Sequence, residues 1–190
     1  MTDALRTKFL DAHNYRRELL ATGQVAKRNG NYLPKAANMQ RMRYNCALEV
    51  QVGEFLKTCP KAGSAESARI GTGENFLRIS QDGIADYTKA VEKAVTSWWK
   101  VIRTTEGIGM AVTFRAHHVG APISSFTQMA WATSRKLGCA VAKCTGDYIA
   151  VCRYQPRGNY VEQVVYAKGT PCSACPSGAW CTNGALCALP

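Results

Sequence analysis

The sequence lacks the features that mark several large classes of protein. Among its 190 residues, no uninterrupted apolar run approaches the roughly 20 residues that a membrane-spanning helix needs. There is no Gly-x-Ser-x-Gly turn for a nucleophilic serine, no Gly-Lys-Ser/Thr phosphate loop and no His-Glu-x-x-His zinc helix. There is also no Asn-x-Ser/Thr site for N-glycosylation. We therefore expect no transmembrane segment, and none of these three kinds of catalytic site is indicated.

Groups for acid–base chemistry are scarce. Histidine occurs three times, at His13, His117 and His118. The two neighbouring histidines point in different directions in an extended chain, so they are not predicted to share one metal ion. Four carboxylates in the middle of the chain can supply an acid–base pair, although helix caps and surface charges are the alternative interpretation: Glu74, Asp82, Asp86 and Glu92.

The chain is strongly basic. Lys and Arg number 24 against 13 Asp and Glu, which gives a net charge of +11. Such a charge raises the possibility of a nucleic-acid or glycosaminoglycan ligand. The basic residues are scattered in small groups, however: Arg16-Arg17, Lys27-Arg28, Arg41 and Arg43, Arg135-Lys136, Arg153 and Arg157. With no basic run and no nucleic-acid motif, we predict no nucleic-acid partner and favour a solvated basic surface, with weak salt-sensitive binding to anionic surfaces left open.

Cysteine is abundant by contrast. Nine cysteines are many for a cytosolic protein, whose thiols stay reduced. Four of them lie in residues 172–190, a tail rich in Gly, Pro, Ser and Ala that has little to pack, so disulfides would order it. We therefore predict a secreted, extracellular protein, and interpret the chain as the mature form without its signal peptide. Zinc at Cys172-x-x-Cys175 is the alternative, but the gaps that follow are shorter than those of a zinc ribbon.

Hydrophobic spacing and caps predict the elements of the first half of the chain. Helices are expected over residues 2–21, 45–56 and 85–99, the first capped by Thr2-Asp3 and the third by Asp82. Residues 61–72 are expected to form a loop, 73–77 a short extended piece, and 103–123 an irregular segment.

The most informative stretch covers residues 124–160. It starts as a helix, which Ser124 or Ser125 can cap with Gln128 in a capping box. Two predicted strands follow, at 137–141 and 148–154, joined by a turn at 145–147. Each strand region carries cysteine, so a hairpin stapled by Cys139 and Cys152 is the simplest interpretation. A last strand is expected within 161–166.

The same stretch resembles the signatures of the CAP superfamily, which groups cysteine-rich secretory proteins, insect venom antigens and plant pathogenesis-related proteins of group one. Several motifs occur in the order typical of the family: Gly73-Glu74-Asn75, Ala94-Val95-x-x-Trp98-Trp99, Phe126-Thr127-Gln128-Met129-x-Trp131, Leu137-Gly138-Cys139-Ala140, and Cys152 to Tyr160. The tail resembles the hinge of the Ancylostoma-secreted, or activation-associated secreted, proteins of parasitic nematodes, the venom-allergen-like group.

This resemblance implies an α+β fold, a three-layer α-β-α sandwich with a central antiparallel sheet. It divides the chain into a CAP domain at residues 1–168 and a cysteine-rich hinge-like extension at 169–190. By analogy with the family and its hinge, the implied disulfides are Cys59–Cys144, Cys139–Cys152, Cys172–Cys181 and Cys175–Cys187. The odd cysteine is Cys46, which predicts a disulfide-linked homodimer.

The departures from the family pattern concern its cleft. CAP proteins often place two His and two Glu there, a tetrad that can hold zinc. At the matching positions this chain has Gly63 and Ser125 for the histidines, and Glu74 and Val101 for the glutamates. One carboxylate does not hold zinc by itself, so we predict no metal, no cofactor and no catalytic residue.

Three functions are compatible with these features. The first is a secreted, non-enzymatic CAP protein of a parasitic nematode, acting in host–parasite interaction and immune modulation by binding a host protein or receptor. The second is an extracellular carrier of a sterol or fatty acid, with a pocket lined by Tyr32, Leu33, Met39 and Met42, for which core packing is the alternative. The third and weakest is a protease.

Overall fold

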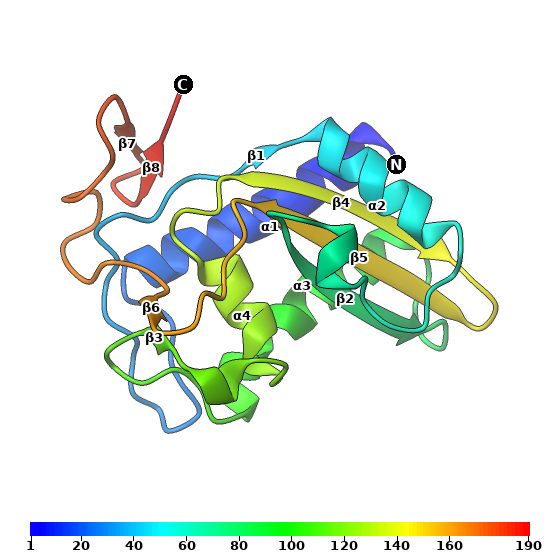
Figure 1. Cartoon of the computed structure of the whole chain (residues 1–190), viewed down its shortest axis with the longest axis horizontal. Coiled ribbons are helices and arrows are strands. Elements are labelled where there is room, and N and C mark those ends of the chain that lie inside the picture. The colour runs from blue at the N-terminus through cyan, green and yellow to red at the C-terminus, as the bar shows by residue number, and fades with distance from the viewer.

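A four-stranded sheet lies between two layers of helices in the computed structural model, which describes residues 1–190 (Figure 1). The strands are ordered β1-β4-β5-β2, with β1 parallel to β4 and the other pairs antiparallel. Helix α2 covers one face, and α1, α3 and α4 pack together against the other. The predicted α+β class and three-layer arrangement are confirmed. The bounds are α1 Asp3–Ala21, β1 Arg43–Tyr44, α2 Cys46–Leu56, β2 Gly73–Ser80, α3 Tyr87–Thr104, α4 Ile123–Ala130, β4 Lys136–Lys143 and β5 Asp147–Gln155.

The remaining elements are short. Strand β3 (Thr113–Phe114) pairs with β6 (Gln163–Val164), and β7 (Trp180–Thr182) pairs with β8 (Leu186–Ala188). Two 3₁₀ turns occupy Glu66–Ala68 and Ala116–His118. No helix reaches the combination of length and hydropathy with which a helix crosses a membrane.

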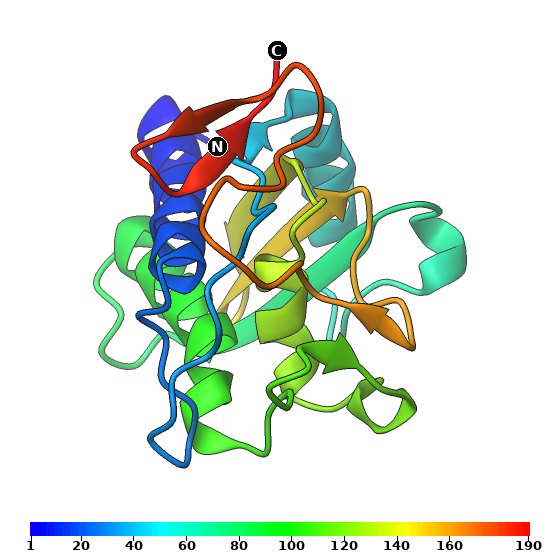
Figure 2. The ribbon, with the colours of Figure 1, turned by 90° about the vertical axis from the view of Figure 1, so that its left-hand side faces the viewer.

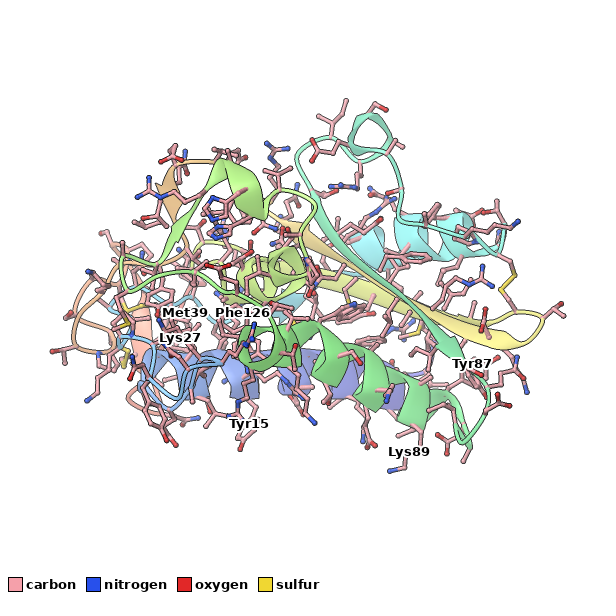
Figure 3. The ribbon with its side chains drawn as sticks, turned by 90° about the horizontal axis from the view of Figure 1, so that it is seen from below. Tyr15, Lys27, Met39, Tyr87, Lys89 and Phe126 are labelled. Carbon is pink, nitrogen blue, oxygen red and sulfur yellow. A yellow bond between two sulfur atoms is a disulfide. The ribbon has the colours of Figure 1, made fainter.

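The predicted hairpin is the centre of the core, because both of its faces are buried. Successive side chains of a strand point to opposite faces. On β5, Ile149 and Val151 pack with Val52 and Leu56 of α2, whereas Tyr154 packs into the larger cluster beneath α1, α3 and α4. Figure 3 shows α1 and α3 side by side on that second face, with Tyr15 and Lys89 directed outward.

Gly138 of β4 permits α2 to lie this close to the sheet. A Cβ atom at this position would come within 2.4 Å of Leu48 Cβ and 2.6 Å of the backbone nitrogen of Glu49. Carbon atoms cannot approach to that distance, so any larger residue would displace α2.

Two helix starts differ from the sequence prediction. Helix α3 begins at Tyr87, because the Asp86 carboxylate, not that of Asp82, accepts from a backbone amide in the first turn, that of Lys89. Helix α4 begins at Ile123 without a side-chain cap. Neither serine that was expected to cap it does so: Ser124 donates its hydroxyl to His118 O, and Ser125 donates to the carbonyls of Trp98 and Pro122. The strand expected within 161–166 is reduced to two residues, 163–164.

The C-terminal tail packs onto the main body. The Cys187 amide donates to Met39 O at 2.8 Å, and Cys187 O accepts from the Arg41 amide at 2.8 Å. Leu186 is fully buried and belongs to the main core cluster. Figure 2 shows the β7–β8 hairpin lying beside α1.

Four disulfides join eight of the nine cysteines: Cys59–Cys144, Cys139–Cys152, Cys172–Cys181 and Cys175–Cys187. These pairs coincide with those that the family resemblance implies. The tail sulfurs lie close enough together to resemble a metal cluster, but each is already bonded to another sulfur. The zinc alternative for the tail therefore does not fit, because thiolates are the ligands that zinc requires. Cys46 is exposed and unpaired.

Arg17 of α1 connects the helical layer to the strands. It is fully buried, and its guanidinium makes five hydrogen bonds of 2.7–3.0 Å to backbone carbonyls, those of Gln40, Met129, Trp131 and Ala132. Burial lowers the pKa of Arg17 to about 9, which reflects the cost of removing a cation from water. The carbonyls at the end of α4 offset part of that cost, because the C-terminus of a helix carries partial negative charge.

We predict that Arg17→Met destabilises the protein by about 3–5 kcal/mol. It leaves the carbonyls of Gln40 and Met129 without a donor, at a cost of about 1–3 kcal/mol each. The other two carbonyls keep backbone amide donors. The stability of Arg17→Lys should lie between that of Arg17→Met and that of the wild type, because an ammonium keeps the charge but cannot reach all four carbonyls. The measurement is urea unfolding at pH 7. The control is Arg16→Met. The half-buried side chain of Arg16 donates to only one carbonyl and one hydroxyl. Equal losses for Arg16→Met and Arg17→Met would contradict the assigned role.

Candidate functional site

Three of the four residues at the expected cleft positions line one cleft. Glu74 of β2, Val101 of α3 and Ser125 of α4 lie on the walls of a hollow of about 410 Å³. Gly63 instead lines a neighbouring groove of about 1000 Å³ that runs beside α2. It nevertheless lies close to Glu74, since a Cβ atom on Gly63 would be 3.0 Å from Glu74 Oε1.

The Glu74 carboxylate is already fully engaged within the protein. Oε1 accepts from the Ser64 amide at 2.7 Å, and Oε2 accepts from the Ser64 hydroxyl at 2.7 Å and from Arg153 Nε at 3.2 Å. The side chains of Glu74 and Arg153 are only 3% and 5% exposed, respectively. Both carboxylate oxygens are thus satisfied without any bound ligand.

Strand register places this ion pair. Glu74 of β2 stands directly opposite Arg153 of β5. Opposite residues of an antiparallel pair have their side chains on the same face, here the face that α2 covers. From there Arg153 Nη1 donates to Gln51 of α2 at 3.1 Å and Nη2 to the Ser64 hydroxyl at 3.4 Å. The guanidinium therefore joins the sheet, α2 and the 61–72 loop.

The donor set does not fit zinc. Zinc sites use nitrogen, sulfur and carboxylate ligands, usually four in a tetrahedron. The cleft offers the occupied carboxylate of Glu74, the aliphatic side chain of Val101, and the Ser125 hydroxyl, which is bonded to Trp98 O. Arg153 also brings a positive charge to the one carboxylate present. The residues that line this hollow therefore do not provide a zinc donor set, and Glu74 is the one carboxylate among them.

None of the histidines lines this cleft. His13 is fully buried, with Nδ1 donating to Phe9 O at 2.7 Å and Nε2 accepting from the Tyr154 hydroxyl at 2.9 Å. His118 is buried against Phe114, and its Nδ1 accepts from the Arg115 amide. These contacts make His13 and His118 structural.

Asn75, the neighbour of Glu74, faces the opposite side of the sheet. Its side-chain amide donates to Ser125 O at 3.0 Å and to the Tyr154 hydroxyl at 3.2 Å. A chain of hydrogen bonds therefore runs from α4 through β2 and β5 to His13 on α1. Burial lowers the pKa of His13 to about 3, so this histidine is neutral in the folded protein.

The prediction from sequence did not assign roles to Arg153, Gln51 or Ser64. Arg153 was visible as a basic residue inside the motif from Cys152 to Tyr160, on the strand predicted at 148–154. A charge on a strand that packs in the core needs a partner, and the prediction did not use this signal of an internal ion pair. The identity of the partner depends on strand register, which the sequence pattern did not supply.

A match to the family described as "CAP: Cysteine-rich secretory protein family" covers residues 10–154. The Ancylostoma secreted protein of Ancylostoma caninum is 38% identical over 195 aligned residues, which span 100% of this chain and 45% of that protein. The crystal structure of Na-ASP-1 superposes with a TM-score of 0.91 at 37% identity, over 98% of this chain and 47% of that one. The chain therefore spans about half the length of these two relatives.

The crystal structure of a third relative, NaASP2 with Zn2+, superposes with a TM-score of 0.85 at 35% identity, over 91% of this chain and 90% of that one. Zinc is thus associated with that relative. In this chain, the one carboxylate at the expected cleft positions is bound by Arg153 and Ser64 instead.

We expect Glu74→Gln to lower the free energy of unfolding by about 3 kcal/mol or more, because it leaves the buried Arg153 cation without its counter-charge. Glu54→Gln is the matched control, since Glu54 pairs with Lys57 on the exposed surface of α2, where ion pairs contribute less than about 1 kcal/mol. Chemical denaturation at pH 7 measures both variants. A loss for Glu74→Gln no larger than for Glu54→Gln would mean that the pair does not stabilise the fold.

Because His13 is buried and neutral, we predict that the free energy of unfolding depends on pH. Its pKa is about 3 when folded and about 6.5 when unfolded, so the unfolded chain takes up the proton first as the pH falls. The stabilisation is complete above about pH 6.5 and is lost progressively towards pH 3. Between pH 7 and pH 4 we expect the His13 contribution to fall by about 3 kcal/mol. Unfolding measured at both pH values should show a smaller drop in His13→Gln; identical drops would refute the assignment.

Proposed function

Because the chain belongs to the CAP, or cysteine-rich secretory protein, family, we propose that it is a secreted, non-enzymatic protein that binds a host protein or receptor in host–parasite interaction. The relative in Ancylostoma caninum is named a secreted protein, and the four disulfides suit an oxidising extracellular setting. Cys46 is the residue that would link two copies in the homodimer that the odd cysteine count predicts.

The state of the cleft supports a binding role over a catalytic one. General acid–base catalysis needs a titratable group that can reach the substrate. Glu74 is the only titratable residue on the wall of the 410 Å³ hollow, and its two oxygens are held by Ser64 and Arg153. We therefore propose that the tetrad of the family no longer holds zinc in this chain.

The observation that carries the proposal is the groove of about 1000 Å³ between α2 and the 63–72 segment. Two aliphatic side chains on its rim are unusually exposed, Val50 at 63% and Ile70 at 88%. Exposed apolar side chains beside a groove are typical of protein-binding surfaces, which desolvate such groups on contact. Arg69 and Glu54 on the same walls add polar groups of both signs.

Lipid carriage gains no comparable support. Of the four residues suggested to line a lipid pocket, Leu33, Met39 and Met42 are at most 2% exposed and belong to the main core cluster. Tyr32 is 60% exposed on the surface. The core-packing alternative accounts for the three buried residues.

The proposal is tested by binding fluorescently labelled protein to cultured mammalian cells. Saturable binding should be competed by unlabelled protein and abolished by trypsin treatment of the cells, as a protein receptor requires. Val50→Asp combined with Ile70→Asp should weaken it at least tenfold, because it places charge in an apolar contact. The control is Val164→Asp, a 53% exposed valine on β6 away from the groove. Binding that is unsaturable, trypsin-resistant or equally affected by the control variant would overturn the proposal.

A further inference from the structure

Four basic side chains from two distant parts of the sequence meet beside the edge strand of the sheet. Arg41, Arg43, Arg135 and Lys136 line a hollow of about 140 Å³, whose other walls are Leu189 and Pro190. We call these four residues the edge cluster. The sequence shows them only as two separate pairs, about ninety positions apart.

Backbone pairing holds the edge cluster in place. Arg43 of β1 lies opposite Lys136 of β4 in the parallel pair, and the Arg43 amide donates to Arg135 O at 2.8 Å. The Arg41 amide donates to Cys187 O at 2.8 Å, and the Arg43 guanidinium donates to Leu189 O. The cluster is therefore preorganised by the sheet and the tail, which lowers the ordering cost of binding a ligand.

The charges of the edge cluster are not neutralised within the protein. None of its four cations forms an ion pair with a carboxylate, whereas six other arginines do: Arg6, Arg69, Arg78, Arg115, Arg153 and Arg157. Three of the four cluster residues are exposed to solvent. Cations held this close repel each other, and an anionic ligand relieves that repulsion.

We propose that the edge cluster is a binding site for a sulfated glycosaminoglycan chain. Arginine is suited to sulfate because its planar guanidinium presents parallel N–H donors to tetrahedral oxyanions. An extended polyanion can contact Arg41 and Arg43 on one side of the hollow and Arg135 and Lys136 on the other. No aromatic residue lines the hollow, so the stacking that single-stranded nucleic acids use is missing.

The test is isothermal titration of the whole protein with a heparin oligosaccharide in 0.15 M NaCl. The double variant Arg43→Gln with Arg135→Gln should bind at least tenfold more weakly, with a shallower dependence of affinity on salt. The control is Lys93→Gln with Lys100→Gln, which removes the same charge from exposed, unpaired positions on α3 outside the cluster. This control should change affinity less than threefold. Unfolding midpoints confirm that both double variants are folded.

Several results would overturn the proposal. Equal weakening by the two double variants would assign binding to the net charge alone. Equal affinity for desulfated heparin, or for a single-stranded oligodeoxynucleotide of the same charge, would exclude sulfate recognition. Absence of saturable binding at 0.15 M NaCl would exclude the site. Of the edge cluster, Lys136 alone also lines the groove of Val50 and Ile70, and it is unchanged in every variant, so the receptor proposal is tested separately.

Discussion

The arrangement of the helical layer depends on a single buried cation. Arg17 crosses from α1 to the carbonyls of three segments: residue 40 before β1, the last turn of α4, and residues 131–132 before β4. No carboxylate neutralises it, so the aligned peptide dipoles at the end of α4 must provide the negative potential. Because α4 carries Ser125 and residue 40 precedes the edge strand β1, the guanidinium fixes both a wall of the cleft and the position of the sheet's edge.

Local patterns were sufficient to predict much of this fold. The spacing of Leu5, Phe9 and Ala12 gave α1, with its Thr2 cap, and the two cysteine-bearing runs gave the β4–β5 hairpin. The error at the start of α4 arises because its side chains have tertiary partners. Ser125 and Gln128 match a capping box, but Ser125 bonds Trp98 O, while Gln128 bonds the Gly158 amide and Ser134. A capping pattern cannot predict such contacts, because its residues are chosen for local geometry alone.

The sequence motifs predicted three of the residues that line the cleft but not the contacts that these residues make. The motif positions identified Glu74, Val101 and Ser125, and the structure brings these three to one hollow while Gly63 lines the next. The contact that decides the chemistry, Glu74 with Arg153, follows from the β2–β5 register. A shift of one residue would have turned Arg153 to the other face of the sheet. The sequence alone does not determine the strand register. In the structure, the buried Arg153 cation holds the buried Glu74 carboxylate in an ion pair.

Charged residues near the two edges of the sheet are arranged in opposite ways. Between β2 and β5 a buried acid and a buried base neutralise each other, and further hydrogen bonds satisfy their remaining atoms. At the β1–β4 edge, cations gather with no acidic side chain among them. With 13 acidic residues against 24 basic ones, the chain cannot neutralise every cation, so their placement is what distinguishes one surface from another. The internal pair occupies the carboxylate of Glu74, and the unpaired cations leave long-range attraction for anions at the edge. This placement of charge supports the proposed role in recognition at the surface.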